Sequence, residues 1–237
     1  MQIDDSIRHF RIRIHDYLGE RDRKLLPREV SVKRSAKYLE VGCGTRFTYR
    51  KLQMVEEYGL DVVPHMVRLC KKRYNKAHGV VGSVMYLPFR QRSYDIIVSN
   101  TLLHHLVGKS PSAYRTNIET AMKEMRRILK LKGYVLVSEL ITRNRLFSYL
   151  MFWATYICAK LSIEINWLDI HGKVIIFFMD RKMFEEISED LGFQVKEIES
   201  KKWLLTRNYI NLGKQTEFLL TRKTTHSHLN EHSHYPS

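Results

Sequence analysis

A short loop with two glycines is the first place where residue types and spacing could do chemistry. The stretch reads "YLEVGCGTRF" over residues 38–47, so that Glu40 is followed by Gly42 and Gly44. Glycine has no Cβ, and a GxG turn between a strand and a helix lets backbone N–H groups approach a ligand closely. Asp61, at the end of the next expected strand, could accept hydrogen bonds from two ribose hydroxyls. The spacing indicates a nucleotide-like ligand.

Two residues of this loop argue against a nicotinamide dinucleotide as that ligand. The dinucleotide fingerprint requires Gly or Ala at its last position, because a helix must pack closely on a strand there, and Phe47 is too large. Glu40 stands just before the loop, where its carboxylate would repel a pyrophosphate. The same carboxylate would suit a cationic ligand, such as one that carries a sulfonium or an ammonium group.

A second candidate for chemistry is the pair His104 and His105, which follows the fourth expected strand. Histidine titrates near neutral pH, so either ring could serve as a general base. In the structural alternative, one histidine packs against the following turn and the other is solvated. The same region argues against two kinds of reaction on nucleic-acid bases. It contains "SNTL" where enzymes that methylate the adenine amino group have an Asn/Asp-Pro-Pro motif. It also has no cysteine for the covalent attack on cytosine C5.

The elements that would position these residues alternate between strand and helix. Runs of apolar and β-branched residues predict strands over 37–41, 58–63, 79–85, 94–100, 134–140, 194–200 and 217–223. Helical patterns cover 48–57, 65–74, 114–130 and 181–193, with Lys132-Gly133 closing the third of them. This alternation predicts an α/β doubly wound, mostly parallel seven-stranded sheet with a ligand crevice at the carboxyl ends of its strands.

The segment "LFSYLMFWATYICA" over residues 146–159 contains no charged residue. It is too short for a transmembrane helix, which needs about 20 apolar residues. A helix that is apolar on all sides is buried, covers a site or lies in a membrane interface. The sequence leaves these alternatives open.

Charge and cysteine content limit the class of partner and the compartment. The net charge of +15 invites a polyanion or an anionic membrane surface, although a basic solvated surface would give the same value. The three cysteines form no CxxC pair, which argues against a disulfide framework or a zinc site and for a reducing compartment. The N-terminus lacks the apolar core of a secretory signal, so a cytoplasmic location is expected.

Four stretches of the sequence resemble the class I S-adenosylmethionine (SAM)-dependent methyltransferases. Within that family the similarity is to the small-molecule branch that includes the enzymes of ubiquinone and menaquinone biosynthesis. It runs from about Lys37 to Gly192, with weaker support as far as Arg222. In chain order the four stretches are "LEVGCGT", "YGLDVVPHMV", "GSVMYLPFRQRSYDIIVSNTLLHHL" and "MRRILKLKGYVLVSE".

The resemblance implies a Rossmann-like methyltransferase fold and assigns binding roles to named positions. Asp61 would hold the ribose hydroxyls of SAM. The methionine end would lie against Glu40, Gly42, Cys43, Gly44 and Asn100, and the adenine against Val62, Ser83 and Val84. Two residues depart from the family pattern, because Arg46 replaces its third glycine and Ser83 replaces the acid beside the adenine.

The resemblance also suggests a domain organisation. Residues 37–223 would form the methyltransferase domain, with a hydrophobic lid over about 143–175. Residues 1–36 would be an N-terminal helical extension, and the His-rich residues 224–237 a disordered tail with no functional metal site.

The functional expectation is methyl transfer from SAM to a small acceptor. The aromatic residues of the lid imply a hydrophobic or aromatic acceptor, with peripheral membrane contact through residues 146–159. His104 or His105 would be the general base. An RNA methyltransferase remains an alternative because of the positive charge, although no RNA-binding motif accompanies it. A non-catalytic SAM-binding protein is a further alternative, because Arg46 and Ser83 could weaken the site.

Overall fold

The structure, a computed structural model, describes most of the expected domain. The described residues are 25–31, 33, 35–49, 56–163, 175–205 and 210–223. For residues 202–205 and 210–212 the structure describes the backbone alone. The expected N-terminal extension up to residue 24, part of the expected lid (164–174) and the His-rich tail lie outside the described residues.

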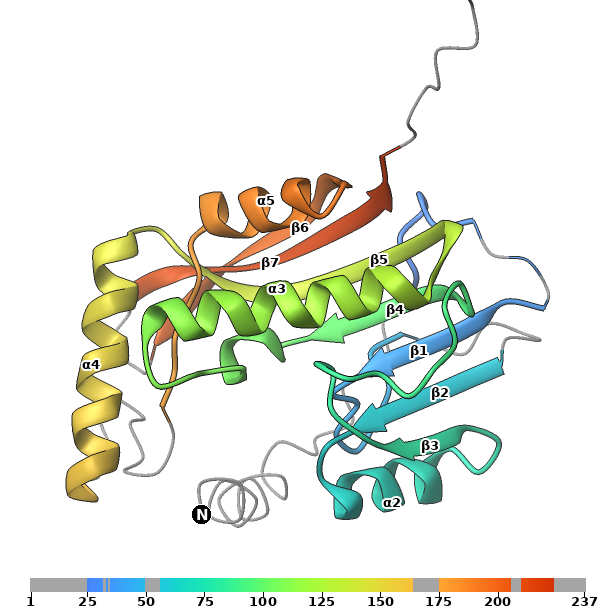
Figure 1. The fold of residues 1–237 in the computed structure, drawn as a ribbon, viewed down its shortest axis with the longest axis horizontal. Helices are drawn as coiled ribbons and strands as arrows, with labels where there is room; N and C mark the ends of the chain where they lie inside the picture. The colour runs from blue at the N-terminus through green and yellow to red at the C-terminus, as the bar shows by residue number, and fades with distance from the viewer. Residues whose placement is uncertain are drawn as a thin grey trace, which may run out of the picture.

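A seven-stranded sheet forms the centre of the molecule, with the order β3-β2-β1-β4-β5-β7-β6 (Figure 1). The first five strands in this order pair in parallel. β7 runs antiparallel to both β5 and β6, so the sheet is mixed. The strands are β1 (Lys37–Val41), β2 (Glu56–Asp61), β3 (His78–Val81), β4 (Tyr94–Asn100), β5 (Leu129–Thr142), β6 (Phe193–Leu205) and β7 (Ile210–Arg222).

Hydrophobic cores lie on both faces of the sheet, because successive strand residues point to opposite sides. In β4, Ile97 packs in the core that contains the apolar faces of α3 and α5, while Ile96 packs in the core that contains Cys70 of α2. The sheet is therefore doubly wound, as predicted. The helices are α2 (Pro64–Arg73), the 3-10 turn η1 (Leu103–His105), α3 (Pro111–Ile128), α4 (Arg145–Leu161) and α5 (Arg181–Asp190).

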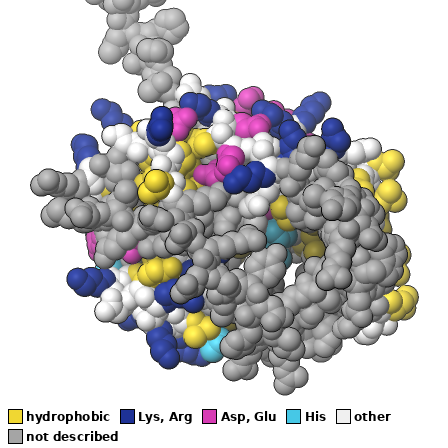
Figure 2. Space-filling model, turned by 180° about the vertical axis from the view of Figure 1, so that it is seen from behind, with side chains coloured by type: hydrophobic (Ala, Val, Ile, Leu, Met, Phe, Trp, Pro, Cys, Tyr) yellow, Lys and Arg dark blue, Asp and Glu magenta, His cyan; other side chains and the backbone are white. Residues whose placement is uncertain are grey.

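Helix α4 stands at one edge of the molecule, across the ends of β5 and β7 (Figure 1). Asn144 caps its N-terminus by accepting a hydrogen bond from the Leu146 N–H at 2.8 Å. Its buried side contributes Phe152 to the main core. Seen from behind, hydrophobic side chains also gather along this outer edge of the molecule (right side of Figure 2). No helix among the described residues is long and apolar enough to cross a membrane.

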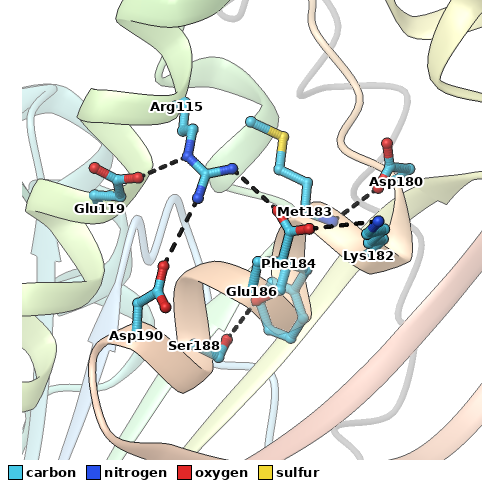
Figure 3. Close-up of polar contacts among 9 residues, drawn as sticks. All are labelled: Arg115, Glu119, Asp180, Lys182, Met183, Phe184, Glu186, Ser188 and Asp190. Atoms are coloured by element: carbon cyan, nitrogen blue, oxygen red, sulfur yellow. Dashed lines mark hydrogen bonds and ion pairs between the residues drawn. The ribbon is translucent and has the colours of Figure 1, made fainter.

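Helix α5 is tied to α3 by an ion network centred on Arg115 (Figure 3). The guanidinium of Arg115 in α3 contacts Glu119 of its own helix at 2.8 Å, and Glu186 and Asp190 of α5 at 3.3 and 3.9 Å. Beneath the network, the buried Phe184 packs against Phe218 of β7. Polar and apolar contacts thus hold α5 against the sheet.

Several predicted element boundaries are wrong for identifiable reasons. Residues 48–57 do not form one helix, because Glu56 and Glu57 already belong to β2; residues 50–55 lie outside the described part. Lys132-Gly133 does not close α3, since β5 begins at Leu129. A Cβ at Gly133 would lie 2.9 Å from the carbonyl oxygen of Asp95, so this glycine permits close pairing of two strands.

Two predicted strands end earlier than expected. The second was predicted to run to Val63, but β2 ends at Asp61 and Val63 is the residue that precedes α2. The third was predicted over 79–85, but β3 ends at Val81. In both places the polar contacts of the next turn replace strand pairing, and those turns belong to the candidate site.

Candidate active site

The glycine loop after β1 adopts the backbone conformation that its sequence requires. Gly42 and Gly44 have φ angles of 67° and 53°, in the left-handed region that side chains with a Cβ rarely adopt. A Cβ added at Gly44 would meet no heavy atom within 4 Å, so its Cα faces open space. The loop therefore combines a left-handed turn with room for a ligand beside the backbone.

Asp61 connects this loop to the end of β2. Its Oδ2 accepts a hydrogen bond from the Gly44 N–H at 2.9 Å, and its Oδ1 accepts one from the Val63 N–H at 2.9 Å. Burial raises the pKa of Asp61 above its ordinary value, and the backbone donors of Val63, Gly44 and Val62 oppose that shift. A carboxylate has about four acceptor positions, and the two short hydrogen bonds from Gly44 and Val63 leave acceptor capacity for a ribose hydroxyl.

Glu40 is buried and organises the chain that follows the loop. Its carboxylate accepts hydrogen bonds from the Thr48 N–H at 2.8 Å, the Thr48 hydroxyl at 2.6 Å and the Tyr38 hydroxyl at 2.6 Å. Only 2% of the residue is exposed. These contacts favour an indirect role, in which Glu40 fixes the loop, over direct contact with a ligand.

Cys43 and Arg46 of the glycine loop make contacts within the protein. The Cys43 thiol is buried, and its pKa is raised, first by its hydrogen bond with Cys70 and then by burial, so the neutral thiol dominates. The Arg46 N–H donates to the Cys43 carbonyl oxygen at 3.2 Å, which closes a tight turn at the position of the family's third glycine. A non-glycine residue at position 46 is thus compatible with the loop.

The residues expected near adenine lie in the turns after β2 and β3. Val62 is half exposed, while Val84 is buried in the main core. The Ser83 hydroxyl accepts a hydrogen bond from the Met85 N–H at 3.2 Å and so caps its own turn. Asn100 ends β4 and is the register partner of Ser138 in β5. Since β2, β1, β4 and β5 are neighbours, these predicted positions share one edge of the sheet.

His104 has a buried partner, Glu139, which was not identified from the sequence. His104 Nδ1 lies 2.5 Å from Oε1 of Glu139, near the carboxyl end of β5. Glu139 is fully buried, and its carboxylate also accepts hydrogen bonds from the N–H groups of Leu103 at 2.7 Å and Leu140 at 2.9 Å. A carboxylate held in this way orients the imidazole and selects its tautomer.

His105 differs from His104 in its exposure. Its side chain reaches solvent although protein atoms surround most of the ring, and its ring centroid lies 4.0 Å from that of His104. The pKa of His105 is lowered, first by desolvation from the surrounding protein and then by the nearby His104. A lowered pKa keeps this ring neutral at physiological pH.

Comparison with known proteins shows similarity to methyltransferases. Residues 39–137 match the model of the methyltransferase domain. The chain is 25% identical to a demethylmenaquinone methyltransferase of Thermotoga maritima, over 67% of this chain and 70% of that protein. It is 27% identical to the probable tRNA methyltransferase 9B of mouse, over 53% of this chain and 27% of that protein.

The fold has close counterparts among solved structures. A SAM-dependent methyltransferase of Methanosarcina mazei superposes with a TM-score of 0.59 at 18% sequence identity, over 81% of this chain and 95% of that one. Taken together, the matched domain and the relatives support an enzyme that uses SAM, and the fold is that of SAM-dependent methyltransferases. Among such enzymes, the chain is similar to the demethylmenaquinone methyltransferases.

The residues of the site fit SAM as the cofactor. The open space beside Gly44 accommodates a close backbone approach, and Asp61 retains free acceptor positions at the adjoining strand end. Cys43 is buried, so its thiol contributes to packing of the loop. The backbone of Arg46 and the hydroxyl of Ser83 each make a hydrogen bond within a local turn.

Proposed function

We propose that the protein transfers a methyl group from SAM to a small lipophilic or aromatic acceptor, in the cytoplasm at a membrane surface. The observation that carries this proposal is the largely buried aromatic side chains that lie beside His104 and along the inner side of α4. The ring of Phe178 lies 5.9 Å from His104, and the neighbouring Phe177 lies 5.7 Å from Tyr149 and 6.1 Å from Phe152 of α4. Such surroundings favour an apolar acceptor beside the candidate base.

The cofactor would be held by the residues expected from the sequence. Asp61 would accept hydrogen bonds from the ribose, and the backbone of Gly42, Cys43 and Gly44 would line the methionine end together with Asn100. Glu40 would act through Thr48, as its buried contacts indicate. The adenine would lie beside Val62, Ser83 and Val84.

SAM supplies an electrophilic methyl group, so the protein mainly has to align an acceptor with it. Alignment of this kind can lower a barrier by about 7–11 kcal/mol. With Nδ1 of His104 donating to Glu139, Nε2 carries the lone pair of the ring. His104 Nε2 would then take the proton from an acceptor hydroxyl or acidic carbon, which contributes roughly 10²–10⁴-fold.

His105 is the second candidate for the base. Its ring is exposed and its lowered pKa keeps it neutral, whereas the contact with the buried Glu139 belongs to His104. We assign it to the acceptor side of the site, where a neutral, accessible ring can contact the substrate.

An RNA acceptor is the rival function, and two observations favour it. The net charge is +15, and one relative is named as a probable tRNA methyltransferase. The aromatic surroundings of His104 favour the small acceptor, because the RNA proposal requires a basic path to the site rather than an apolar one.

Transfer of a labelled methyl group from SAM into an extract of the native host tests the proposal. The product is partitioned into organic phase, nucleic acid and protein, and the Asp61→Asn variant provides the background. Label in the organic phase that the variant does not produce supports a lipophilic acceptor. Label in RNA replaces it with the rival function, and label in protein contradicts both.

A further inference from the structure

The outer face of α4 exposes a continuous row of large apolar side chains. Their spacings of four, three, four and four residues place them within about 80° of the helix circumference. At 1.5 Å per residue, the row is about 22 Å long. Its members, each between 49% and 64% exposed, are Leu146, Leu150, Trp153, Ile157 and Leu161. We call these five residues the α4 stripe.

The side of α4 opposite the stripe is the side that packs in the core. Ser148, Phe152, Thr155 and Cys158 are buried against the domain, and Phe152 belongs to the main core. The helix is therefore fixed to the protein by one side while its other side presents apolar surface. Contiguous exposed apolar patches on soluble domains usually mark interaction sites.

The charges around the stripe indicate what covers it. Helix α4 contains no acidic residue, and Arg145 and Lys160 stand near its two ends. Lys160 extends over the ring of Tyr156, with Nζ 5.2 Å from the ring centroid. This arrangement, with an apolar body and a cationic head, is typical of side chains at a lipid interface.

A basic groove continues from the start of α4. Two acids also line it, but Asp180 caps α5 and Glu197 is paired with Arg181. Arg181 also pairs with Glu185, and Lys182 pairs with Glu186, so the excess of positive charge where the stripe begins comes from Arg143, Arg145 and Lys214. The five basic residues of the groove are Arg143, Arg145, Arg181, Lys182 and Lys214.

We propose that the α4 stripe docks flat on an anionic phospholipid bilayer, with the basic groove against the lipid phosphates. Helices of this kind lie in the interface through apolar burial plus attraction to anionic lipids. A second copy of the chain is a poorer occupant, because two such faces would bring Arg145, Lys160 and their counterparts together without an acid on α4 to pair with them. The purpose of docking rests on the proposed lipophilic acceptor, but docking itself requires no methyl transfer.

Flotation with vesicles tests the docking surface on the full-length protein. We expect binding to vesicles of equal parts phosphatidylcholine and phosphatidylglycerol, weaker binding to pure phosphatidylcholine, and release by high salt. The triple variant Leu150→Ser/Trp153→Ser/Ile157→Ser should lose about tenfold in partitioning per side chain removed. Leu131→Ser, an equally exposed leucine at the start of β5, is the matched control and should bind like the original protein.

Charge is tested separately with Arg145→Gln and Lys160→Gln. Each should weaken binding to the anionic vesicles by about fivefold and leave binding to pure phosphatidylcholine unchanged. Thermal unfolding and SAM binding of every variant confirm that the fold is retained.

Three results would overturn the proposal. The first is a protein that does not float with the anionic vesicles, and the second is a triple variant that floats as well as the Leu131→Ser control. The third is a lipid-free dimer that the triple variant converts to a monomer, which would assign the stripe to a second copy. If the protein docks but no label enters the organic phase, the docking surface is supported and the lipophilic acceptor is rejected. If the protein methylates a detergent-solubilised acceptor but does not dock, the acceptor is supported and the docking surface is rejected.

Discussion

His104 Nδ1 and Glu139 Oε1 are 2.5 Å apart, and they join the turn after β4 to the end of β5. The N–H groups of Leu103 and Leu140 fix the carboxylate from two sides. A base oriented by a third group is the general pattern of activated catalytic side chains. We therefore propose Glu139 as a positioning residue and His104 as the better candidate for the base.

Glu139→Gln tests this role directly. A glutamine amide can donate to Nδ1, which would place the proton on Nε2 and remove the lone pair that accepts the proton of the substrate. We expect kcat to fall by about 10²–10⁴-fold while the affinity for SAM stays within about twofold. Turnover kinetics and SAM titration measure the two quantities.

The histidine variants complete the comparison. His104→Asn should lower kcat as much as Glu139→Gln, and the double variant should be no worse than either single variant. His105→Asn should raise KM more than it lowers kcat. A larger loss of kcat in His105→Asn than in His104→Asn would transfer the base role to His105.

Asp61 predicts a pH dependence of SAM binding. Its ionised form would accept the proposed hydrogen bonds from the ribose hydroxyls, and burial raises its pKa. Affinity for SAM should therefore begin to fall at a higher pH than for an ordinary aspartate as the solution is acidified. Asp61→Asn should bind SAM weakly and without this dependence. Calorimetric titrations across the acidic range measure it, and equal slopes for both proteins would contradict the assignment.

The raised pKa of Asp61 affects the stability of the ligand-free protein in the opposite direction to its effect on the affinity for SAM. Because the folded-state pKa of Asp61 is raised, its contribution favours folding at low pH and is lost as the pH rises through that value. Bound SAM should therefore stabilise the protein least at acidic pH, where the ionised acceptor is depleted. Thermal unfolding with and without SAM gives this difference.

Gly44 predicts a cost that arises from the backbone and not from crowding. Its φ of 53° is unfavourable for any residue with a Cβ, although the space beside it is open. Gly44→Ala should cost about 1–2 kcal/mol in the free energy of unfolding and weaken SAM binding. Gly82→Ala is the control, since Gly82 has no positive φ and its nearest neighbour is a flexible leucine side chain. Equal effects of the two substitutions would reject the conformational explanation.

The strands and the position of the site follow from the sequence because local signals are strong there. β1 and β4 have the predicted bounds, since both are short runs of buried apolar residues that end at a turn. The glycine loop and Asp61 meet as expected, because the carboxyl ends of neighbouring parallel strands share an edge. Periodicity and turn residues suffice for both results.

Other features depend on contacts between distant residues. The antiparallel direction of β7 is set by pairing with β5 and β6, and no local pattern encodes it. Glu139 carried a usable signal, because it is the one acid in the apolar stretch "YVLVSEL". Its partner, 35 residues away, could not be identified from the sequence. For residues 146–159 the sequence left burial, coverage of a site and a membrane interface open, because a stretch without charges shows no amphipathic pattern that would identify the exposed face of α4.

The attachment of α5 to α3 allows polar and apolar contributions to be compared at one interface. Arg115 and its partners are about one-third to three-quarters exposed, whereas Phe184 is fully buried (Figure 3). Exposed ion pairs contribute about 0.2–1 kcal/mol, while removing a buried phenylalanine costs about 3–5 kcal/mol. Arg115→Ala should therefore lower the free energy of unfolding by at most about 1 kcal/mol, and less at high salt, whereas Phe184→Ala should lower it several times more. Urea unfolding at low and high salt measures both, and a larger loss for Arg115→Ala would show that the ion network, not the buried ring, holds α5 in place.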